Sequence, residues 1–317
     1  MAGVLVTGAA GFIGSHLCEA LLRGGRKVVG LDNLGEAFGR ERKEQNVARL
    51  AGQPGFVFVR GDVRDRDCVR QTLGRHGPET VVHLAALGGV RESFRSPDEY
   101  ADVNVRGLCT LVAECRESLV EHIVFGSSSS VYGDRDDPPF AESDAADRPV
   151  SPYAATKRAG ELLLNAFHAG FGIPVTSLRF FTVYGPRQRP GMAIGSFVAR
   201  IIRDEPVTLF GDGSSRRDYT YIDDVVEGTL RALERPGGCL VLNIGSGRPI
   251  TLLRLVETIA AAVGREARVA WTERATGDVG LTWADPSRAE AVLGFRARVS
   301  LEEGIRRTVD ATRSDRP

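Results

Sequence analysis

A tyrosine and a lysine lie four residues apart in the run Ser151-Pro152-Tyr153-Ala154-Ala155-Thr156-Lys157. Proline favours the first turn of a helix, and residues i and i+4 share one helical face. The phenol of tyrosine has a pKa of about 10, and a neighbouring ammonium lowers that pKa because it stabilises the phenolate. We therefore predict that Tyr153 and Lys157 form a proton-transfer pair that works near neutral pH.

The plain alternative is an exposed lysine one turn after a half-buried tyrosine. Lysine is rare in this chain, however, and Lys27, Lys43 and Lys157 are the three present. Arginine supplies the other basic residues, so a generic surface cation would be an arginine here. The lysine is interpreted as functional because its charge, unlike that of arginine, can be tuned by its surroundings.

A run of four serines, Ser127-Ser128-Ser129-Ser130, precedes the tyrosine and follows a predicted strand. A serine hydroxyl at a strand end can hydrogen-bond both the phenol oxygen and the reacting hydroxyl of a substrate, which fixes the geometry of proton transfer. Ser128 and Ser130 share a face by strand alternation. Ser128 is the first candidate for this catalytic role, and Ser130 is the second.

Three glycines separate a predicted strand from a predicted helix near the N-terminus. Glycine lets the backbone take unusual dihedral angles and approach a pyrophosphate, which then lies at the N-terminus of the helix. The spacing is GxxGxxG, where the familiar fingerprint is GxGxxG. We expect a dinucleotide site, with a helix-capping turn as the alternative. The residues assigned to this loop are Gly8, Gly11, Phe12, Ile13 and Gly14.

An aspartate, Asp32, ends the second predicted strand. A carboxylate there accepts a hydrogen bond from a ribose hydroxyl and repels a 2'-phosphate, which favours NAD over NADP. Arg40 and Arg42 nearby leave NADP open, and a turn role is the alternative for the aspartate. The next strand ends fall on the same predicted edge. The further cofactor-binding residues are Asn33, Asp62, Val63, Leu84, Ala85 and Ala86.

The first half of the chain alternates short apolar runs with longer amphipathic stretches, which is typical of βαβ units. Right-handed crossovers would build a doubly wound parallel Rossmann-type sheet that binds its ligand at the carboxyl ends of the strands. Strands are predicted at Val4–Thr7, Lys27–Leu31, Phe56–Arg60, Thr80–Leu84, His122–Gly126 and Pro174–Phe180. Helices are predicted at Gly14–Arg23, Pro97–Glu117, Tyr153–Phe171, Met192–Asp204, Leu252–Val263 and Leu301–Ala311.

After about Phe181 the elements become shorter and are separated by turns rich in Gly, Pro and Arg. We expect an NAD-binding domain over residues 1–180 and a smaller C-terminal α/β substrate domain over 181–317. The apolar run Cys239–Ile244 can rejoin the first sheet as an added strand. The two domains are therefore expected to interleave, with about 218–245 returning to the first.

The overall charge gives no long-range attraction to nucleic acid or an anionic membrane, because 41 basic residues balance 41 acidic ones. No apolar run reaches the roughly 20 residues of a membrane helix, and no secretion signal is evident. Five scattered cysteines fit reduced thiols, so a cytoplasmic protein is expected. The five histidines lack i, i+4 pairs and CxxC companions, which argues against a metal site.

Together these residues resemble the extended short-chain dehydrogenases, specifically the sugar-nucleotide epimerase and dehydratase group. The resemblance covers nearly the whole chain, from Thr7–Gly14 through Asp218–Val225 and Gly277–Val279 to Glu303–Ile305. It implies that the N-terminal domain binds NAD, that Asn104 lies near the active site and that the C-terminal domain binds a nucleotide sugar. It also implies a homodimer that pairs through the tyrosine-bearing helix and its neighbour.

Within that group, the segment Leu178–Pro190 most resembles the UDP-glucuronate 4-epimerases. An arginine suits a uronate because it holds a carboxylate through paired charged hydrogen bonds. By resemblance, Thr182 and Arg189 reach the sugar, Arg217 contacts the pyrophosphate and Asp278 contacts the nucleoside ribose. A solvated, arginine-rich loop is the alternative. The expected substrate-binding residues are Arg91, Ser128, Thr182, Arg187, Arg189, Arg217 and Asp278.

Two departures from the pattern lie near the expected sugar site. Gly191 replaces an acidic residue, and Leu87-Gly88-Gly89-Val90-Arg91 replaces the usual Gln-Ala-Gly-Val-Arg. The resemblance implies 4-epimerisation through a transient 4-keto sugar. Related dehydratases carry Asp-Glu before Val-Tyr-Gly and related decarboxylases a Glu, whereas this chain has Ser129-Ser130, so both reactions are disfavoured. The alternatives are a UDP-glucose or UDP-N-acetylglucosamine 4-epimerase, an NADPH-dependent reductase, and a non-catalytic NAD-binding regulator.

Overall fold

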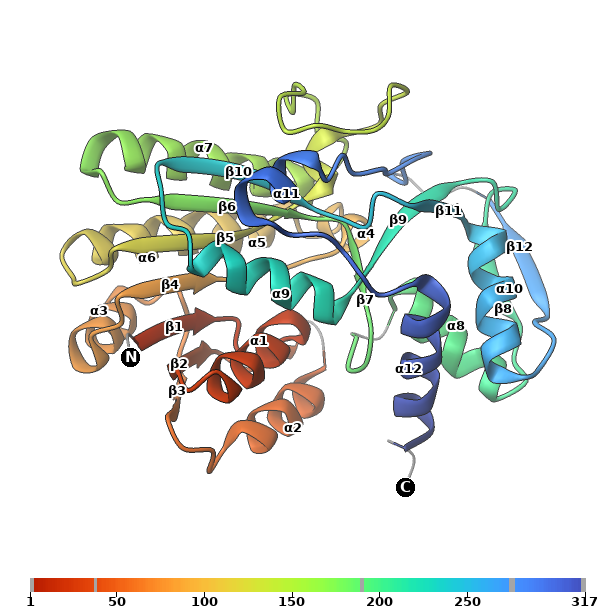
Figure 1. Cartoon of the computed structure of the whole chain (residues 1–317), viewed down its shortest axis with the longest axis horizontal. Coiled ribbons are helices and arrows are strands. Elements are labelled where there is room, and N and C mark those ends of the chain that lie inside the picture. The colour runs from red at the N-terminus through yellow and green to blue at the C-terminus, as the bar shows by residue number, and fades with distance from the viewer. Residues whose placement is uncertain (1–2, 37–38, 189–190, 274–276, 315–317) are drawn as a thin grey trace.

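A computed structural model describes residues 3–36, 39–188, 191–273 and 277–314 (Figure 1). A large parallel sheet with helices on both faces fills one side of the molecule, and a smaller set of helices and short strands fills the other. In the described part of the chain, no helix combines the length and apolar character needed to cross a membrane.

The central sheet has seven parallel strands in the order β10-β6-β5-β4-β1-β2-β3. Its central strands β4, β5 and β6 are buried along their whole length, because helices cover both faces and the apolar runs of the sequence face them. The strands are β1 (Gly3–Thr7), β2 (Lys27–Asp32), β3 (Phe56–Arg60), β4 (Thr80–His83), β5 (His122–Ser128), β6 (Val175–Phe180) and β10 (Cys239–Ile244). The predicted doubly wound sheet is confirmed.

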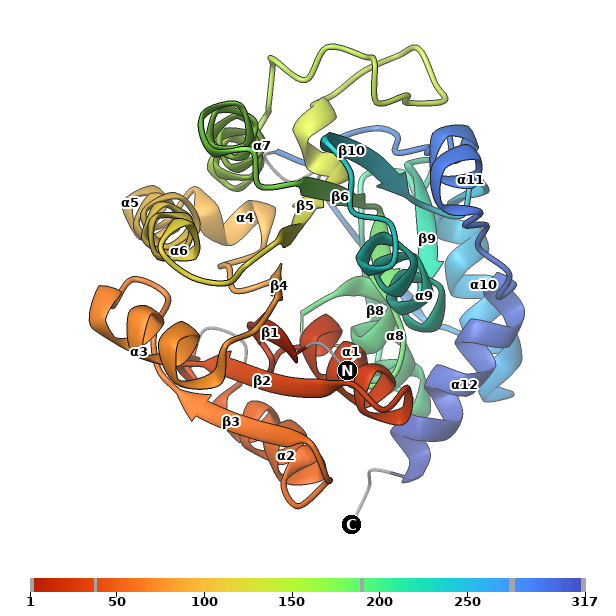
Figure 2. The same ribbon diagram turned by 60° about the vertical axis from the view of Figure 1, so that its left-hand side comes forward.

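Two helical layers enclose this sheet, as Figure 2 shows. Leu17 and Val225 belong to the core on one face, and Leu111 and Leu164 belong to the core on the other. The first layer contains α1 (Phe12–Arg23), α2 (Arg40–Leu50) and α9 (Ile222–Leu233). The second contains α3 (Arg66–His76), α6 (Gly107–Arg116) and α7 (Pro152–Phe171).

The smaller part of the molecule contains a three-stranded sheet, β11-β9-β7, and a two-stranded sheet, β12-β8. The chain leaves this part through α9, which packs on α1, and then adds β10 to the edge of the first sheet. The strands are β7 (Thr182–Tyr184), β8 (Val207–Phe210), β9 (Arg216–Tyr221), β11 (Pro249–Thr251) and β12 (Val269–Thr272). The helices are α8 (Ala193–Ile202), α10 (Leu252–Val263) and α12 (Leu301–Ser314), whereas α11 (Ser287–Leu293) packs against β10 and α9 of the larger part.

The stretch predicted as one helix from Pro97 to Glu117 is divided in the structure. It contains α5 (Pro97–Ala101), a wider π-helical segment η2 (Asp102–Arg106) and α6. Two polar helices, α2 and α3, were not predicted. Just two residues of α2 are buried, Asn46 and Leu50, so an apolar periodicity is nearly absent there.

The segment between the serine run and α7 ties the two parts of the molecule together. The Phe140 nitrogen donates to the Trp283 carbonyl at 2.7 Å, and the Asp285 nitrogen donates to the Phe140 carbonyl at 2.9 Å. The Phe140 ring is fully buried in a small core, which the structure builds from Val131, Tyr132, Phe140, Ala146, Phe181 and Ala284. The chain that leaves the serines is therefore anchored to the C-terminal part.

Replacement of this ring tests the anchor. Phe140→Ala should lower the free energy of unfolding by about 3–5 kcal/mol, because it leaves a cavity in a closed core. Urea denaturation measures the change. Leu119→Ala serves as the control, since the Leu119 side chain is 72% exposed and its loss should change stability by less than about 0.5 kcal/mol. Equal losses in the two variants would contradict the role of Phe140.

Candidate active site

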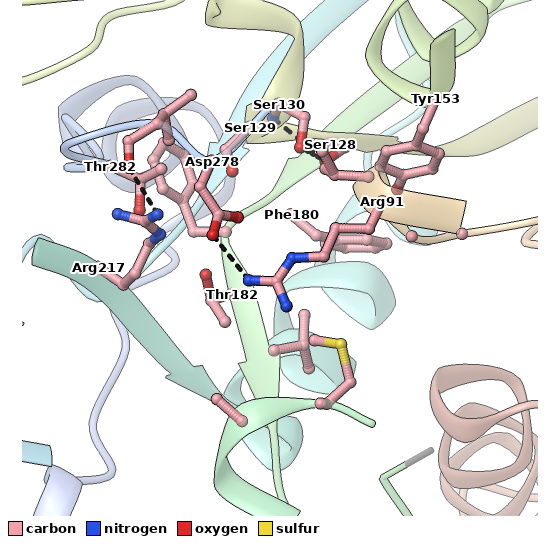
Figure 3. Close-up of a pocket in the computed structure, with 18 of the residues that line it drawn as sticks. Arg91, Ser128, Ser129, Ser130, Tyr153, Phe180, Thr182, Arg217, Asp278 and Thr282 are labelled. Atoms are coloured by element: carbon pink, nitrogen blue, oxygen red, sulfur yellow. Dashed lines mark hydrogen bonds and ion pairs between the residues drawn. The ribbon is translucent and has the colours of Figure 1, made fainter. Parts of the chain in front are cut away.

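A cavity of about 790 Å³ joins the two parts of the molecule. The glycine loop, the serine run with Tyr153, and residues of β7 and β9 all line it. Figure 3 shows the part that contains the serines, Tyr153, Thr182 and Arg217. The cavity opens at the carboxyl ends of the parallel strands, where the strand order reverses between β1 and β4. Open α/β sheets bind their ligands at such a point.

The glycine loop lies directly against the end of β4. Gly8 has φ of +72°, and a Cβ atom added to it would come within 2.7 Å of the Ala85 nitrogen. A Cβ on Gly14 would meet the Gly8 oxygen at 2.2 Å. Gly11 caps α1 without a side-chain hydrogen bond. The first backbone N–H groups of α1 are therefore available to an anion, which fits the pyrophosphate of a dinucleotide.

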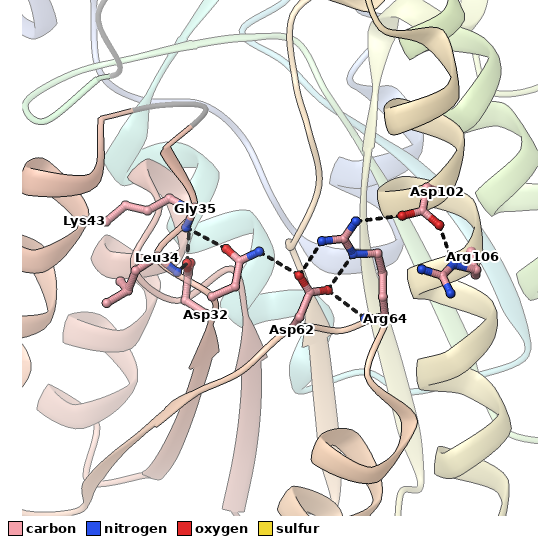
Figure 4. Close-up of polar contacts among 9 residues, drawn as sticks. Asp32, Leu34, Gly35, Lys43, Asp62, Arg64, Asp102 and Arg106 are labelled. Carbon is pink, nitrogen blue, oxygen red and sulfur yellow. Dashed lines mark hydrogen bonds and ion pairs between the residues drawn. The ribbon is translucent and has the colours of Figure 1, made fainter.

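Asp32 is buried at the end of β2, and its carboxylate is held from three sides (Figure 4). It accepts hydrogen bonds from the backbone nitrogens of Leu34 at 2.8 Å and Ala10 at 3.2 Å. Lys43 of α2 adds an ion pair at 3.1 Å. The carboxylate is thus fixed beside the glycine loop. Lys43, which sequence reasoning did not assign, partly neutralises the charge that was expected to repel a 2'-phosphate.

Asp62, beyond the end of β3, belongs to a chain of charged groups (Figure 4). Arg64 donates to its two oxygens at 2.9 and 2.8 Å, and Asn33 donates to it at 2.9 Å. The hydrogen bonds from Arg64 hold the pKa of the Asp62 carboxyl well below its usual range. Arg64 also pairs with Asp102 of η2 at 2.7 Å. Arg64 therefore orders this strand end, and its place two residues after Asp62 was the available signal.

Asn104 lies in the π-helical segment and fastens the loop after β4 to α7. Its amide oxygen accepts from the Leu87 nitrogen at 2.7 Å, and its amide nitrogen donates to the Leu87 oxygen and to the Thr156 hydroxyl, both at 3.0 Å. The Asn104 side chain is buried. Asn104 thus positions the backbone between the cofactor end and the catalytic helix.

The predicted proton-transfer pair lies on the first two turns of α7. Ser151 caps this helix by accepting from the Ala154 nitrogen at 3.1 Å. Tyr153 and Lys157 both line the cavity. The Lys157 ammonium is buried and donates to the Gly126 carbonyl at 2.7 Å. Burial lowers the pKa of Lys157 to about 8, and the Glu161 carboxylate one turn later opposes that shift.

The serine run continues from β5 into a single 3-10 turn, Ser129–Tyr132. The Ser128 hydroxyl accepts from the Ser130 nitrogen at 3.2 Å and donates to the Ser130 hydroxyl at 3.1 Å. Both hydroxyls line the cavity beside Tyr153 (Figure 3). The structure therefore brings together the hydroxyl, phenol and ammonium that the sequence selected for proton transfer.

The opposite end of the cavity carries the groups assigned to the nucleotide sugar. Arg217 of β9 donates to the carbonyls of Val279 at 2.6 Å and Gly280 at 3.3 Å. Asp278 forms an ion pair at 2.7 Å with Arg91, which comes from the N-terminal part (Figure 3). The Arg91 guanidinium also lies over the Phe210 ring at 3.9 Å. This bridge across the cavity had no sequence signal, because its members are far apart in the chain.

Arg187, assigned to the substrate, lies elsewhere. Its guanidinium donates to both carboxylate oxygens of Glu19 on α1, at 2.6 and 2.9 Å, and it does not line the cavity. Arg42 of α2 donates to the neighbouring Gln188 carbonyl. These bonds fasten the segment after β7 to the helices beside the cofactor end. Arg189, the expected carboxylate ligand, is outside the described residues.

The assigned residues divide into those that line the cavity and those that do not. The wall contains Gly8, Gly11, Phe12, Ile13, Gly14, Leu84, Ala86, Arg91, Ser128, Ser130, Tyr153, Lys157, Thr182, Arg217 and Asp278. Residues outside the lining are Asp32, Asn33, Asp62, Val63, Ala85, Asn104 and Arg187. Among the described residues, no three His, Cys, Asp or Glu side chains are grouped so that they could hold a metal ion.

Comparison with known proteins places this geometry in a family. A model of the NAD dependent epimerase/dehydratase family matches residues 4–245. The UDP-glucuronate 4-epimerase of Thermodesulfobacterium geofontis is 38% identical over 307 residues, which cover 96% of this chain and 94% of that protein.

Comparison with solved structures leads to the same family. Bacillus cereus UDP-glucuronic acid 4-epimerase, in complex with UDP-glucuronic acid and NAD, has a TM-score of 0.93 and 37% identity, with 98% of this chain and 99% of that chain covered. Thermotoga maritima UDP-glucose 4-epimerase, with UDP-glucose, has a TM-score of 0.92 and 35% identity over the same shares. These matches confirm the resemblance read from the motifs. The protein therefore belongs to the NAD-dependent epimerase/dehydratase family, and NAD is its cofactor.

Proposed function

We propose that this enzyme epimerises a UDP-sugar at C4 with NAD, and that it interconverts UDP-glucuronate and UDP-galacturonate. The observation that carries the proposal is the meeting of Ser128, Tyr153 and Lys157 on the wall of one cavity. That cavity runs from the glycine loop to Arg217 and Asp278. It can therefore hold a dinucleotide at one end and a nucleotide sugar at the other, with the reacting carbon beside Tyr153.

The proton chemistry falls to residues of this chain. NAD, when bound, accepts the hydride from C4 of the sugar and later returns it. Tyr153, as the phenolate, takes the proton from O4, and Ser128 hydrogen-bonds the same oxygen and orients it. The ammonium of Lys157 stabilises the phenolate. After the 4-keto sugar turns its other face, Tyr153 gives the proton back to O4, so the enzyme ends each cycle unchanged.

A uronate is the preferred sugar for two reasons: the relatives act on it, and residues of this chain are expected to hold its carboxylate. Relatives named UDP-glucuronate 4-epimerase align over nearly the whole chain, and one was solved with UDP-glucuronic acid. The 4-keto form of a uronate is also a β-keto acid that readily loses carbon dioxide. Thr182 and Arg189 would hold its carboxylate and restrict the alignment that decarboxylation needs. Ser129-Ser130 supply no carboxylate for dehydration.

A neutral UDP-sugar is the second candidate, favoured by the open space around the sugar end. A Cβ atom added at Gly88 or Gly191 would meet no atom within 4 Å, so both departures from the family pattern leave room there. The UDP-glucose 4-epimerase from Thermotoga maritima matches almost as well as the uronate enzymes. A non-catalytic NAD-binding regulator has less support, since it needs no Ser-Tyr-Lys set.

We also propose the domain boundaries, the cellular location and the oligomeric state. Residues 1–180 with about 218–245 would form the NAD-binding domain, and 181–317 would bind the nucleotide sugar. All five cysteines are unpaired, which suits a cytoplasmic enzyme. A homodimer through α6 and α7 is part of the proposal on the family resemblance alone.

Removal of the phenol hydroxyl tests the proton-transfer role. Tyr153→Phe should reduce kcat by about 10²–10⁴-fold because O4 loses its acid and base. The NAD content of the purified protein should remain unchanged. Tyr184→Phe is the matched control, because that ring is buried outside the cavity lining. Chromatography of the UDP-sugars measures turnover. Full activity in Tyr153→Phe would refute the assignment.

The pKa of Lys157 predicts a pH profile. The ammonium is present below its pKa of about 8 and is lost above it, so kcat/KM should fall as the pH rises past about 8. In Lys157→Arg the guanidinium stays charged. The residual kcat/KM of that variant should therefore lack this alkaline limb. An identical limb in both proteins would show that another group is responsible.

The choice of sugar is tested by separate incubations with UDP-glucuronate and UDP-glucose. The kcat/KM for UDP-glucuronate should exceed that for UDP-glucose by roughly tenfold or more, since a hydrogen bond to a charged group contributes about 1.5–3 kcal/mol. Nuclear magnetic resonance distinguishes the C4 epimers. Equilibration of the neutral sugar alone would replace the uronate proposal with the second candidate.

A further inference from the structure

A buried ion pair lies behind the catalytic groups, outside the lining of the cavity. Arg179 of β6 donates to both carboxylate oxygens of Glu161 on α7, at 2.9 and 2.8 Å. The two residues are 2% and 4% exposed. The site chemistry described above uses neither side chain.

The Glu161 carboxylate also accepts from the catalytic strand and from its own helix. The Ser127 hydroxyl donates to it at 2.6 Å, and Arg158 donates at 2.9 Å. Burial alone would raise the pKa of Glu161, but the bonds from Arg179 and Ser127 lower it overall, so the group remains a carboxylate. Four directed bonds therefore converge on one buried anion.

Arg179 extends the connection to the far end of the serine run. Its guanidinium carbon lies 4.7 Å from the centre of the Tyr132 ring. Tyr132 ends the turn that carries Ser129 and Ser130, and its hydroxyl donates to Asn243 of β10 at 2.7 Å. The pair thus touches residues on both sides of Ser128 and Ser130.

We propose that the Glu161–Arg179 ion pair positions the catalytic serines against the helix that carries Tyr153 and Lys157, and that turnover depends on it. The inference rests on the proposed epimerase function. Glu161 lies one turn beyond Lys157 on α7, and Ser127 immediately precedes Ser128. The bond between them therefore sets how far the Ser128 hydroxyl lies from the phenol. Glu161 and Arg179 are positioning residues, because neither lines the cavity.

Stability alone does not account for a charged pair here. Well-packed apolar residues of similar volume often replace a buried ion pair without loss of stability. Apolar contacts allow neighbouring elements to shift, whereas the two parallel bonds of an arginine to a carboxylate fix one orientation. Proton transfer needs such precision, since a misplacement of about 1 Å can reduce the rate about 10²-fold.

Glu161→Gln keeps the size of the side chain and removes its charge. We expect kcat to fall about 10²-fold, while KM for the UDP-sugar and the NAD content stay within about twofold of wild type, because Glu161 does not line the cavity. Glu114→Gln is the matched control, since Glu114 is also buried and paired with an arginine, Arg66 at 2.7 Å, away from the site. Its kcat should equal that of wild type.

The pH profile gives a readout that a purely structural role would not change. The Glu161 carboxylate opposes the lowering of the Lys157 pKa, so the alkaline limb of kcat/KM should move to lower pH in Glu161→Gln. Tyr153 shares the helical face of Lys157, and the Lys157 charge also acts on His83 of β4. His83 stays neutral, because burial lowers its pKa to about 3.

A double variant, Glu161→Leu with Arg179→Met, separates position from stability. It should keep a melting temperature near that of wild type and still lose about 10²-fold in kcat. The double variant also tests the positioning role if Glu161→Gln does not fold. Wild-type kcat and an unmoved pH profile in the folded variant would overturn the inference. A wild-type enzyme without activity on any UDP-sugar would instead refute the proposed function.

Discussion

The hydrogen bond from the Lys157 ammonium to the Gly126 carbonyl, 2.7 Å long, joins the catalytic helix to the central sheet. A buried cation is costly unless it is well partnered, so this bond fixes the first turns of α7 over the end of β5. Tyr153 is carried on the same helical face into the cavity. The serines follow Gly126 directly along the chain. One buried charge therefore determines where phenol, hydroxyls and ammonium meet.

The rest of the fold supports this meeting point from both sides. Parallel strands place the glycine loop and the serine run at one edge of the sheet, and the return of the chain through α9 and β10 holds the smaller part against that edge. Arg91 and Asp278 then face each other across the cavity from opposite parts of the molecule. The cofactor end and the sugar end are thus built by different segments but share one wall at Tyr153.

The sequence predicted the features whose signals are local. Tyr153 and Lys157 are visible from their helical spacing, the glycine loop from its place between a strand and a helix, and the sheet from apolar runs buried on both faces. Pairings between distant segments leave no such pattern. Arg187 with Glu19, Lys43 with Asp32, and Arg91 with Asp278 each join separate elements, so the fold alone reveals them. The polar helix α2 was missed for lack of apolar periodicity. The π-helical segment was missed because its Asn104 bonds to Leu87 and Thr156 join distant parts of the chain.

In the proposed reaction, the hydrogen that leaves C4 returns to the same carbon, while Tyr153 moves the O4 proton. This return is tested most directly with UDP-glucuronate that carries deuterium at C4, converted in ordinary water and analysed by mass spectrometry and nuclear magnetic resonance. The UDP-galacturonate formed should keep the deuterium at C4, because the hydride never exchanges with solvent. Product with solvent hydrogen at C4 would contradict the proposed reaction.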